Sequence, residues 1–136
     1  MPAGYSKRPL VQKLGIRPGA RVAILNPPRG YRRTLGPLPA KVAVSRGLNG
    51  PFDFIQFFTR EKRELEARFD PMKKAMAENG ALWISWPKGS SGVSTDVNEN
   101  VVREMALANG LVDVKVCAVD ETWSGLKLVY RLRDRK

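Results

Sequence analysis

Polar and basic side chains follow the expected strands of this chain, and they are the residues best placed to do chemistry. The apolar run in residues 20–26 predicts a strand, and a basic loop follows it. A serine-rich loop follows a later strand. Parallel sheets bind ligands outside the carboxyl ends of their strands. We therefore predict an anion- or partner-binding rim formed by Asn26, Arg29, Arg32, Arg33, Ser85, Trp86, Lys88, Ser90 and Ser91.

The loop after the first strand reads Asn26-Pro27-Pro28-Arg29-Gly30. A nucleotide-binding α/β protein normally places a glycine-rich turn here, and its backbone N–H groups hold an anionic or adenosyl ligand. Pro27 and Pro28 have no N–H group to donate. The sequence therefore predicts no bound cofactor.

The chain contains no histidine and a single cysteine, Cys117. Ser–His and Cys–His nucleophile pairs, histidine bases and most zinc sites are thereby excluded. Without a histidine to activate it, Cys117 is expected to be a packed, unreactive thiol. Asp120 and Glu121 could hold a metal or exchange protons, but adjacent loop carboxylates more often face water. We predict no catalytic residue and no metal site, and we favour a protein that is not an enzyme.

Positive charge is concentrated in the N-terminal part of the chain. The net charge is +11, and the first 52 residues contain ten Lys or Arg and no Asp or Glu. Such a stretch attracts polyanions. The candidate partners are nucleic acid or another polyanion, or a small phosphorylated ligand. The alternative is a basic surface without a dedicated partner.

The length and hydropathy of the chain bound its organisation. A length of 136 residues suits a single domain, residues 1–136. No apolar run approaches the roughly 20 residues of a membrane helix, and no hydrophobic segment follows the basic pair Lys7-Arg8. One cysteine fits a reducing compartment. We expect a cytoplasmic protein with no membrane partner; the oligomeric state is left open.

Hydrophobic periodicity predicts strands that alternate with helices. Expected strands are residues 20–26, 41–45, 52–58 and 81–86, and expected helices are 9–15, 29–35, 60–78 and about 96–109. Asp70-Pro71 predicts a break within the third helix, and the spacing of Asp96 and Glu99 predicts a capping box for the fourth. Two strands of period two in residues 112–132 predict a terminal antiparallel pair. This pattern predicts a mostly parallel α/β sheet with an antiparallel end.

The chain resembles two known families. Phe52-Asp53-Phe54-Ile55, followed by a helix, a glycine turn and a strand in residues 77–85, resembles the C-terminal half of class I S-adenosylmethionine-dependent methyltransferases. Residues 80–88 and 115–127 are similar to a family of small uncharacterised bacterial proteins, a domain of unknown function. The resemblance implies a three-layer Rossmann-like (methyltransferase-like) sheet with a C-terminal antiparallel hairpin, and a bacterial origin. It implies no activity.

The chain departs from the methyltransferase pattern where the cofactor would bind. Ser45-Arg46 stands at the end of the second strand, where those enzymes place an acidic side chain against the ribose. Residues 46–51 are too few for a further helix and strand, so the fold is expected to be shortened. We interpret the chain as a non-catalytic binding or regulatory module for a polyanionic or phosphorylated partner. The alternative is a divergent S-adenosylmethionine-dependent transferase that uses the strand-end cleft.

Overall fold

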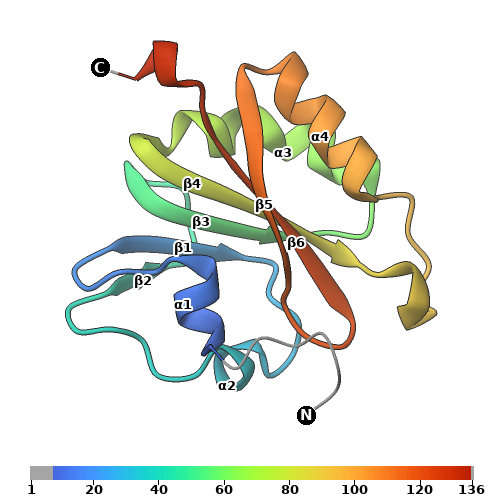
Figure 1. Cartoon of the computed structure of the whole chain (residues 1–136), viewed down its shortest axis with the longest axis horizontal. Coiled ribbons are helices and arrows are strands. Elements are labelled where there is room, and N and C mark those ends of the chain that lie inside the picture. Colours follow the sequence, from blue (N-terminus) through green and yellow to red (C-terminus); the bar gives the residue numbers. More distant parts are fainter. Residues whose placement is uncertain (1–7, 136) are drawn as a thin grey trace.

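The computed structural model describes residues 8–135 and contains a six-stranded sheet (Figure 1). The strands are β1 (Arg21–Leu25), β2 (Ala43–Ser45), β3 (Phe52–Phe58), β4 (Met76–Pro87), β5 (Leu111–Ala118) and β6 (Trp123–Tyr130). Their order in the sheet is β2-β1-β3-β4-β6-β5. β2, β1, β3 and β4 are parallel, whereas β6 runs antiparallel to both β4 and β5. The predicted fold class, a mostly parallel α/β sheet with an antiparallel C-terminal hairpin, is confirmed.

Helices cover both faces of this sheet. They are α1 (Leu10–Leu14), α2 (Tyr31–Leu35), α3 (Lys62–Lys74) and α4 (Glu99–Ala108), with short 3-10 turns η1 (Gly89–Ser91) and η2 (Leu132–Asp134). Leu65 and Phe69 of α3 and Val102 of α4 pack in one buried cluster, and Leu14 of α1 and Tyr31 of α2 pack in another. The sheet is therefore the middle of three layers. Within residues 8–135, no helix has the length and apolar character needed to cross a bilayer.

The connections create a switch point beside β1. From β1 the chain passes to β2 on one side, and from β2 it crosses to β3 on the other side of β1. In open α/β sheets ligands bind outside the carboxyl ends of the strands at such a point. The gap between the ends of β1 and β3 is therefore the place where the fold favours a site.

The third helix is shorter than expected and is not broken. α3 continues through Pro71 and ends at Lys74, and β4 already begins at Met76. The Phe52 N–H donates to the Ala75 carbonyl at 2.8 Å, and Met76 pairs with Phe52. The predicted helix over 60–78 is wrong in its C-terminal end. The residues just after α3 form backbone hydrogen bonds with β3, and this pairing replaces the last helical turn.

The expected capping box of the fourth helix is also wrong. α4 is capped by Asn98, whose Oδ1 accepts from the Val101 N–H at 2.9 Å. Asp96 serves another helix, because its Oδ1 accepts from the Lys62 backbone N–H at 2.6 Å at the start of α3. The side-chain type required for capping was recognised correctly, but a tertiary contact decides which N–H group it meets.

The outer strand β5 does not keep one alternation of buried and exposed residues. Val114 and Val116 are 54% and 50% exposed, whereas Cys117 is buried. The pairing with β6 shifts register between Asp113 and Lys115, which changes the face that the following residues present. Cys117 is thus a packed thiol, as expected in a chain that has no histidine to activate it.

Candidate functional site

A pocket of about 530 Å³ lies at the carboxyl ends of β1 and β2. Its lining residues are Ile24, Leu25, Asn26, Pro27, Arg32, Val44, Arg46 and Arg68. The volume falls in the range of roughly 300–1,000 Å³ that is usual for small-molecule sites. The pocket therefore occupies the edge of the sheet where the topology favours a ligand.

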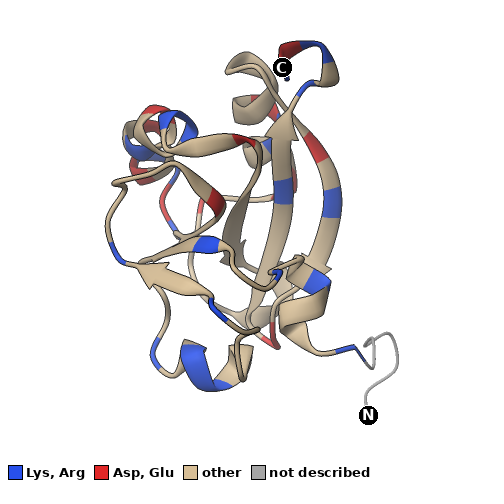
Figure 2. Cartoon of the chain, turned by 90° about the vertical axis from the view of Figure 1, so that its left-hand side faces the viewer, with Lys and Arg blue, Asp and Glu red and all other residues tan. Residues whose placement is uncertain are grey.

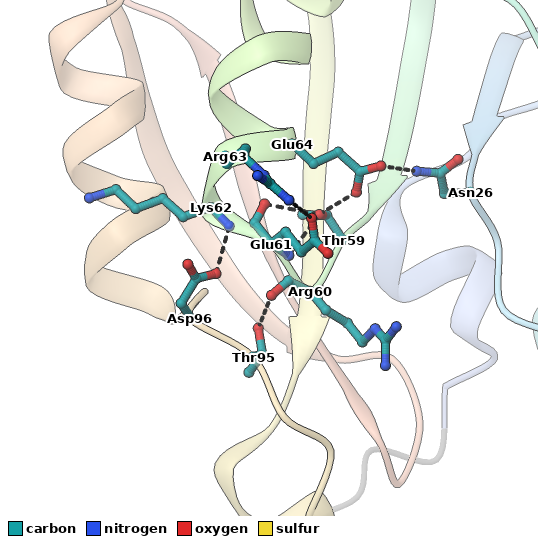
Figure 3. Close-up of polar contacts among 9 residues, drawn as sticks. All are labelled: Asn26, Thr59, Arg60, Glu61, Lys62, Arg63, Glu64, Thr95 and Asp96. Atoms are coloured by element: carbon teal, nitrogen blue, oxygen red, sulfur yellow. Dashed lines mark hydrogen bonds and ion pairs between the residues drawn. The ribbon is translucent and has the colours of Figure 1, made fainter.

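Beside this pocket a carboxylate is held at the switch point (Figure 3). Glu64, in the first turn of α3, accepts from Asn26 Nδ2 at 3.2 Å and from Thr59 Oγ1 at 2.6 Å. Thr59 directly follows β3 and is buried, and its hydroxyl also accepts from the Glu61 N–H at 3.1 Å. Glu64 therefore joins the end of β1 to the end of β3, and its carboxylate has little freedom to move.

The start of α3 is fixed from its other side by the loop before α4. Thr95 Oγ1 donates to the Arg60 carbonyl at 2.6 Å, and Asp96 bonds to the Lys62 N–H as described above. Figure 3 shows these contacts below Glu64, on the opposite side from Asn26. The residues after β3 are thus held by both β1 and the 94–98 loop, which fixes the direction of the first turn of α3.

The pocket is lined by three arginines that come from different elements. Arg32 belongs to α2, Arg46 follows β2 and Arg68 lies one turn after Glu64 on α3. The Arg68 guanidinium lies 5.3 Å from the centre of the Phe57 ring. Among residues 8–135 no ion pair joins these guanidinium groups to a carboxylate. Figure 2 shows how charge is distributed on two of these helices: the charged residues of α2 are all basic, whereas α3 has both basic and acidic residues.

The structure places only part of the predicted rim at this pocket. Asn26 and Arg32 line it, whereas Arg29 and Arg33 are exposed and do not belong to its lining. Asn26 has a φ of 53°, a left-handed conformation that asparagine tolerates better than most residues. The basic loop after β1 therefore contributes to the pocket through two of its four predicted residues.

The remaining predicted residues lie at the end of β4. Ser85 is fully buried, and its hydroxyl accepts from Gln56 Nε2 at 3.2 Å. Trp86 is buried in the cluster that packs under α3 and α4. Lys88 and the exposed Ser90 follow β4, and Ser91 Oγ donates to the Lys88 carbonyl at 2.7 Å. Ser85 and Trp86 thus lie in the interior, and the serine-rich loop does not contribute to the lining of the arginine pocket.

Two site residues were not found from the sequence, Glu64 and Arg68. Both lie in the helix expected over residues 60–78, and neither was named as a candidate site residue. Their spacing of four residues places them on the same face of α3. That spacing, together with the direct succession of β3 and α3, was the available signal.

Asp120, in the loop before β6, has a structural role. Asp120 Oδ1 accepts from the Thr122 and Trp123 N–H groups at 2.8 and 2.7 Å and so closes the turn before β6. Across the part of the chain that the structure describes, no three histidine, cysteine or acidic side chains gather in a way that could hold a metal ion.

Several solved structures share this fold. They include a ribosomal protein L11 methylase from Lactobacillus delbrueckii subsp. bulgaricus, with 12% identity over 90% of this chain and 75% of that chain and a TM-score of 0.60. A SAM-dependent methyltransferase from Aquifex aeolicus has 13% identity over 88% and 86% of the two chains and a TM-score of 0.62. Magnesium protoporphyrin IX methyltransferase from Synechocystis, solved with bound SAH, has 13% identity over 90% and 78% and a TM-score of 0.57. No protein-family model and no curated protein matches the chain.

These neighbours establish a methyltransferase-like Rossmann fold and correct the functional interpretation. The reading as a non-catalytic module for a polyanionic or phosphorylated partner is wrong, because the similar structures are S-adenosylmethionine-dependent methyltransferases. They favour the alternative, a divergent transferase that uses the strand-end cleft.

Proposed function

We propose that this protein is a divergent S-adenosylmethionine-dependent transferase whose site is the cleft at the carboxyl ends of β1 and β2. The observation that carries the proposal is the pocket of about 530 Å³ at this edge, with the carboxylate of Glu64 fixed beside it. The pocket lies next to the switch point between β1 and β3, and Asn26, which lines the pocket, also bonds to Glu64 there.

The charges of the site fit those of the cofactor. S-adenosylmethionine carries a carboxylate together with positively charged ammonium and sulfonium groups. An ionised carboxylate has about four acceptor positions, and the contacts with Asn26 and Thr59 use one on each oxygen of Glu64. Glu64 can therefore accept further hydrogen bonds, and Arg32, Arg46 and Arg68 offer donors to a carboxylate.

In this pocket S-adenosylmethionine must bind in a pose different from the one in which a glycine-rich turn holds it. Pro27 and Pro28 give no N–H groups, so side chains must replace the backbone cradle. Arg46 follows β2 in place of an acidic residue, so the ribose has no carboxylate there. Glu64 is the acidic side chain held at the switch point, and we assign it to the hydroxyl or ammonium groups of the ligand.

When bound, S-adenosylmethionine supplies an activated methyl group. The residues of this chain then bind and orient the cofactor. Glu64 holds its positive or hydroxyl-bearing part, and Asn26 and Thr59 fix the direction of the Glu64 carboxylate. The arginines hold the carboxylate end. The role assigned to each residue is binding and orientation.

Two finer assignments belong to this proposal. The similarity of residues 115–127 supports membership of the small bacterial family of unknown function named above. The single cysteine supports a cytoplasmic location.

Calorimetric titration of the full chain with S-adenosylmethionine and S-adenosylhomocysteine tests the proposal, with thermal unfolding as a second readout. A ligand at about 100 times its dissociation constant stabilises the folded state by ~2.7 kcal/mol. Glu64→Gln is expected to weaken binding about tenfold or more, because a hydrogen bond to a charged group is worth ~1.5–3 kcal/mol. The matched control is Glu66→Gln, an exposed position on the same helix. Absence of binding by the wild-type chain at millimolar ligand, or equal loss in both variants, would overturn the assignment.

A further inference from the structure

A second pocket lies on the opposite edge of the sheet, at the amino ends of β1 and β3. Its volume is about 630 Å³. The loop after α1, the beginning of β3 and the strands β4, β5 and β6 form its walls. The fold does not place its usual ligand here, so this pocket is separate from the site of the proposed function.

Basic side chains from three separate segments converge on this amino-edge pocket. Arg17 lies in the loop after α1, Lys127 lies in β6, and Arg135 directly follows η2. Lys115 pairs with Lys127 across the β5–β6 ladder and adds a fourth positive charge. A Cβ atom at Gly15 would lie 4.0 Å from Lys127 Nζ, so the ammonium group lies close to the loop after α1.

Few negative charges compensate this cluster. Asp53 is the acidic residue in the lining, and its Oδ2 accepts from the Arg21 backbone N–H at 2.8 Å. Lys115 Nζ donates to the Lys13 carbonyl at 2.8 Å and Arg135 Nε to the Tyr130 carbonyl at 3.0 Å, both neutral acceptors. Within residues 8–135 no ion pair joins Arg17, Lys127 or Arg135 to a carboxylate.

The cluster has an energetic cost in the absence of an anion. Burial lowers the pKa of Lys127, and the positive charges of Lys115, Arg17 and Arg135 lower it further. The folded chain therefore holds the Lys127 ammonium less favourably than water does. An anion inside the pocket would offset both contributions, since it supplies opposite charge and hydrogen-bond acceptors.

The pocket also offers apolar surface. Val114 is about half exposed, and Val129 and Ala81 lie at the same wall. A bare inorganic ion would leave this surface and most of the volume in contact with water. The lining therefore matches an anionic group attached to an apolar body of metabolite size.

We propose that the amino-edge pocket binds a small organic anion, with Arg17, Lys127 and Arg135 holding its carboxylate or phosphate group and Val114 and Val129 contacting its apolar part. The proposal does not rest on the transferase assignment. It concerns different residues and the other edge of the sheet.

The test is a titration of the full chain, labelled with ¹³C-lysine, with phenyl phosphate followed by NMR. The Lys127 side-chain resonance, assigned with Lys127→Met, should shift saturably with a dissociation constant in the millimolar range or tighter, and its apparent pKa should rise. Phenylacetate in place of phenyl phosphate distinguishes a carboxylate ligand from a phosphate ligand. Arg17→Gln and Arg135→Gln should each weaken binding about tenfold.

Matched comparisons make the result decisive. Arg133→Gln changes an exposed arginine two residues from Arg135 and outside the lining, and it should leave the affinity unchanged. Thermal unfolding of each variant confirms that it is folded. The proposal is overturned if Lys127 shows no saturable change, if Lys62 and Lys74 respond equally, or if inorganic phosphate or neutral benzyl alcohol binds as tightly as phenyl phosphate.

Discussion

The side-chain amide of Asn26 donates a hydrogen bond to the carboxylate of Glu64, with 3.2 Å between Nδ2 and Oε2. The contact connects the loop after β1 with the first turn of α3, and it does so across the switch point of the sheet. Asn26 reaches Glu64 from a left-handed backbone conformation, with φ at 53°. The position thus combines a backbone requirement with a side-chain contact.

These two requirements can be separated by substitution. Asn26→Gly and Asn26→Val both remove the contact with Glu64, but only valine must be forced into the left-handed region. We expect Asn26→Val to be less stable than Asn26→Gly by roughly 1–2 kcal/mol, the usual cost of that conformation for a residue with a Cβ atom. Urea unfolding of the two variants measures the difference. Equal stabilities would show that the loop relaxes to a different conformation.

A buried hydrogen-bonded chain behind the site gives a second prediction. Tyr31 is 2% exposed and donates to Gln56 Oε1, and Gln56 donates in turn to Ser85. Tyr31→Phe leaves the Gln56 oxygen without its donor and should cost about 1–3 kcal/mol of unfolding free energy. Tyr130→Phe is the comparison, because the half-buried Tyr130 hydroxyl donates to the Lys73 carbonyl and its loss should cost less. A smaller loss for Tyr31→Phe than for Tyr130→Phe would contradict this account.

The same tyrosine predicts a dependence on alkaline pH. Burial raises the pKa of Tyr31 well above its ordinary range. The folded state then retains a proton that the unfolded chain loses above about pH 10. The contribution of protonated Tyr31 to the free energy of unfolding is therefore fully present below that pH and is lost as the pH rises further. Tyr31→Phe should make the decline in unfolding free energy above pH 10 shallower. An unchanged slope in denaturant titrations would show that another group dominates.

The sequence predicted the strands and the edge of the site better than the site's contacts. The apolar run of β3 and the terminal hairpin are local patterns, and the rule that ligands bind at strand ends predicted Asn26 and Arg32, which line the pocket. Glu64 was not recognised because its importance depends on two partners, Asn26 and Thr59, that come from other elements. The same limit explains why Asp96 was assigned to the wrong helix.

Strand β4 shows how tertiary pairing overrides a local signal. Asn79-Gly80 was expected to end a helix, but Gly80 lies inside β4, where a Cβ atom would come within 2.7 Å of the Phe52 carbonyl oxygen. Gly80→Ala should therefore destabilise the fold by about 1–3 kcal/mol, because backbone atoms must move. Gly89→Ala is the control, since nothing lies within 4 Å of its added Cβ atom. Thermal or urea unfolding compares them, and a neutral Gly80→Ala would mean that this part of β4 lies farther from β3.

Lys127 provides the last prediction, since its environment disfavours its own charge. Its pKa is lowered by burial and by Lys115, Arg17 and Arg135, so between that lowered pKa and the ordinary lysine value near 10.4 the unfolded chain binds more protons than the folded one. Stability should therefore increase as the pH rises through this interval. Lys127→Met removes the unfavourable charge, so its Tm at neutral pH should be higher than that of the wild type and should vary less over the same interval.

The control for this variant is Lys74→Met, at an exposed position on α3 that pairs with Asp70 at 3.0 Å, where little change or a slight decrease in Tm is expected. Phenyl phosphate provides a further contrast, because it should raise the Tm of the wild type and of Lys74→Met but not that of Lys127→Met. A lower Tm for Lys127→Met in phosphate-free buffer would indicate that the aliphatic stem of Lys127 stabilises β6 more than its charge destabilises the pocket. The unpaired positive charge would then no longer be a reason to expect an anion there.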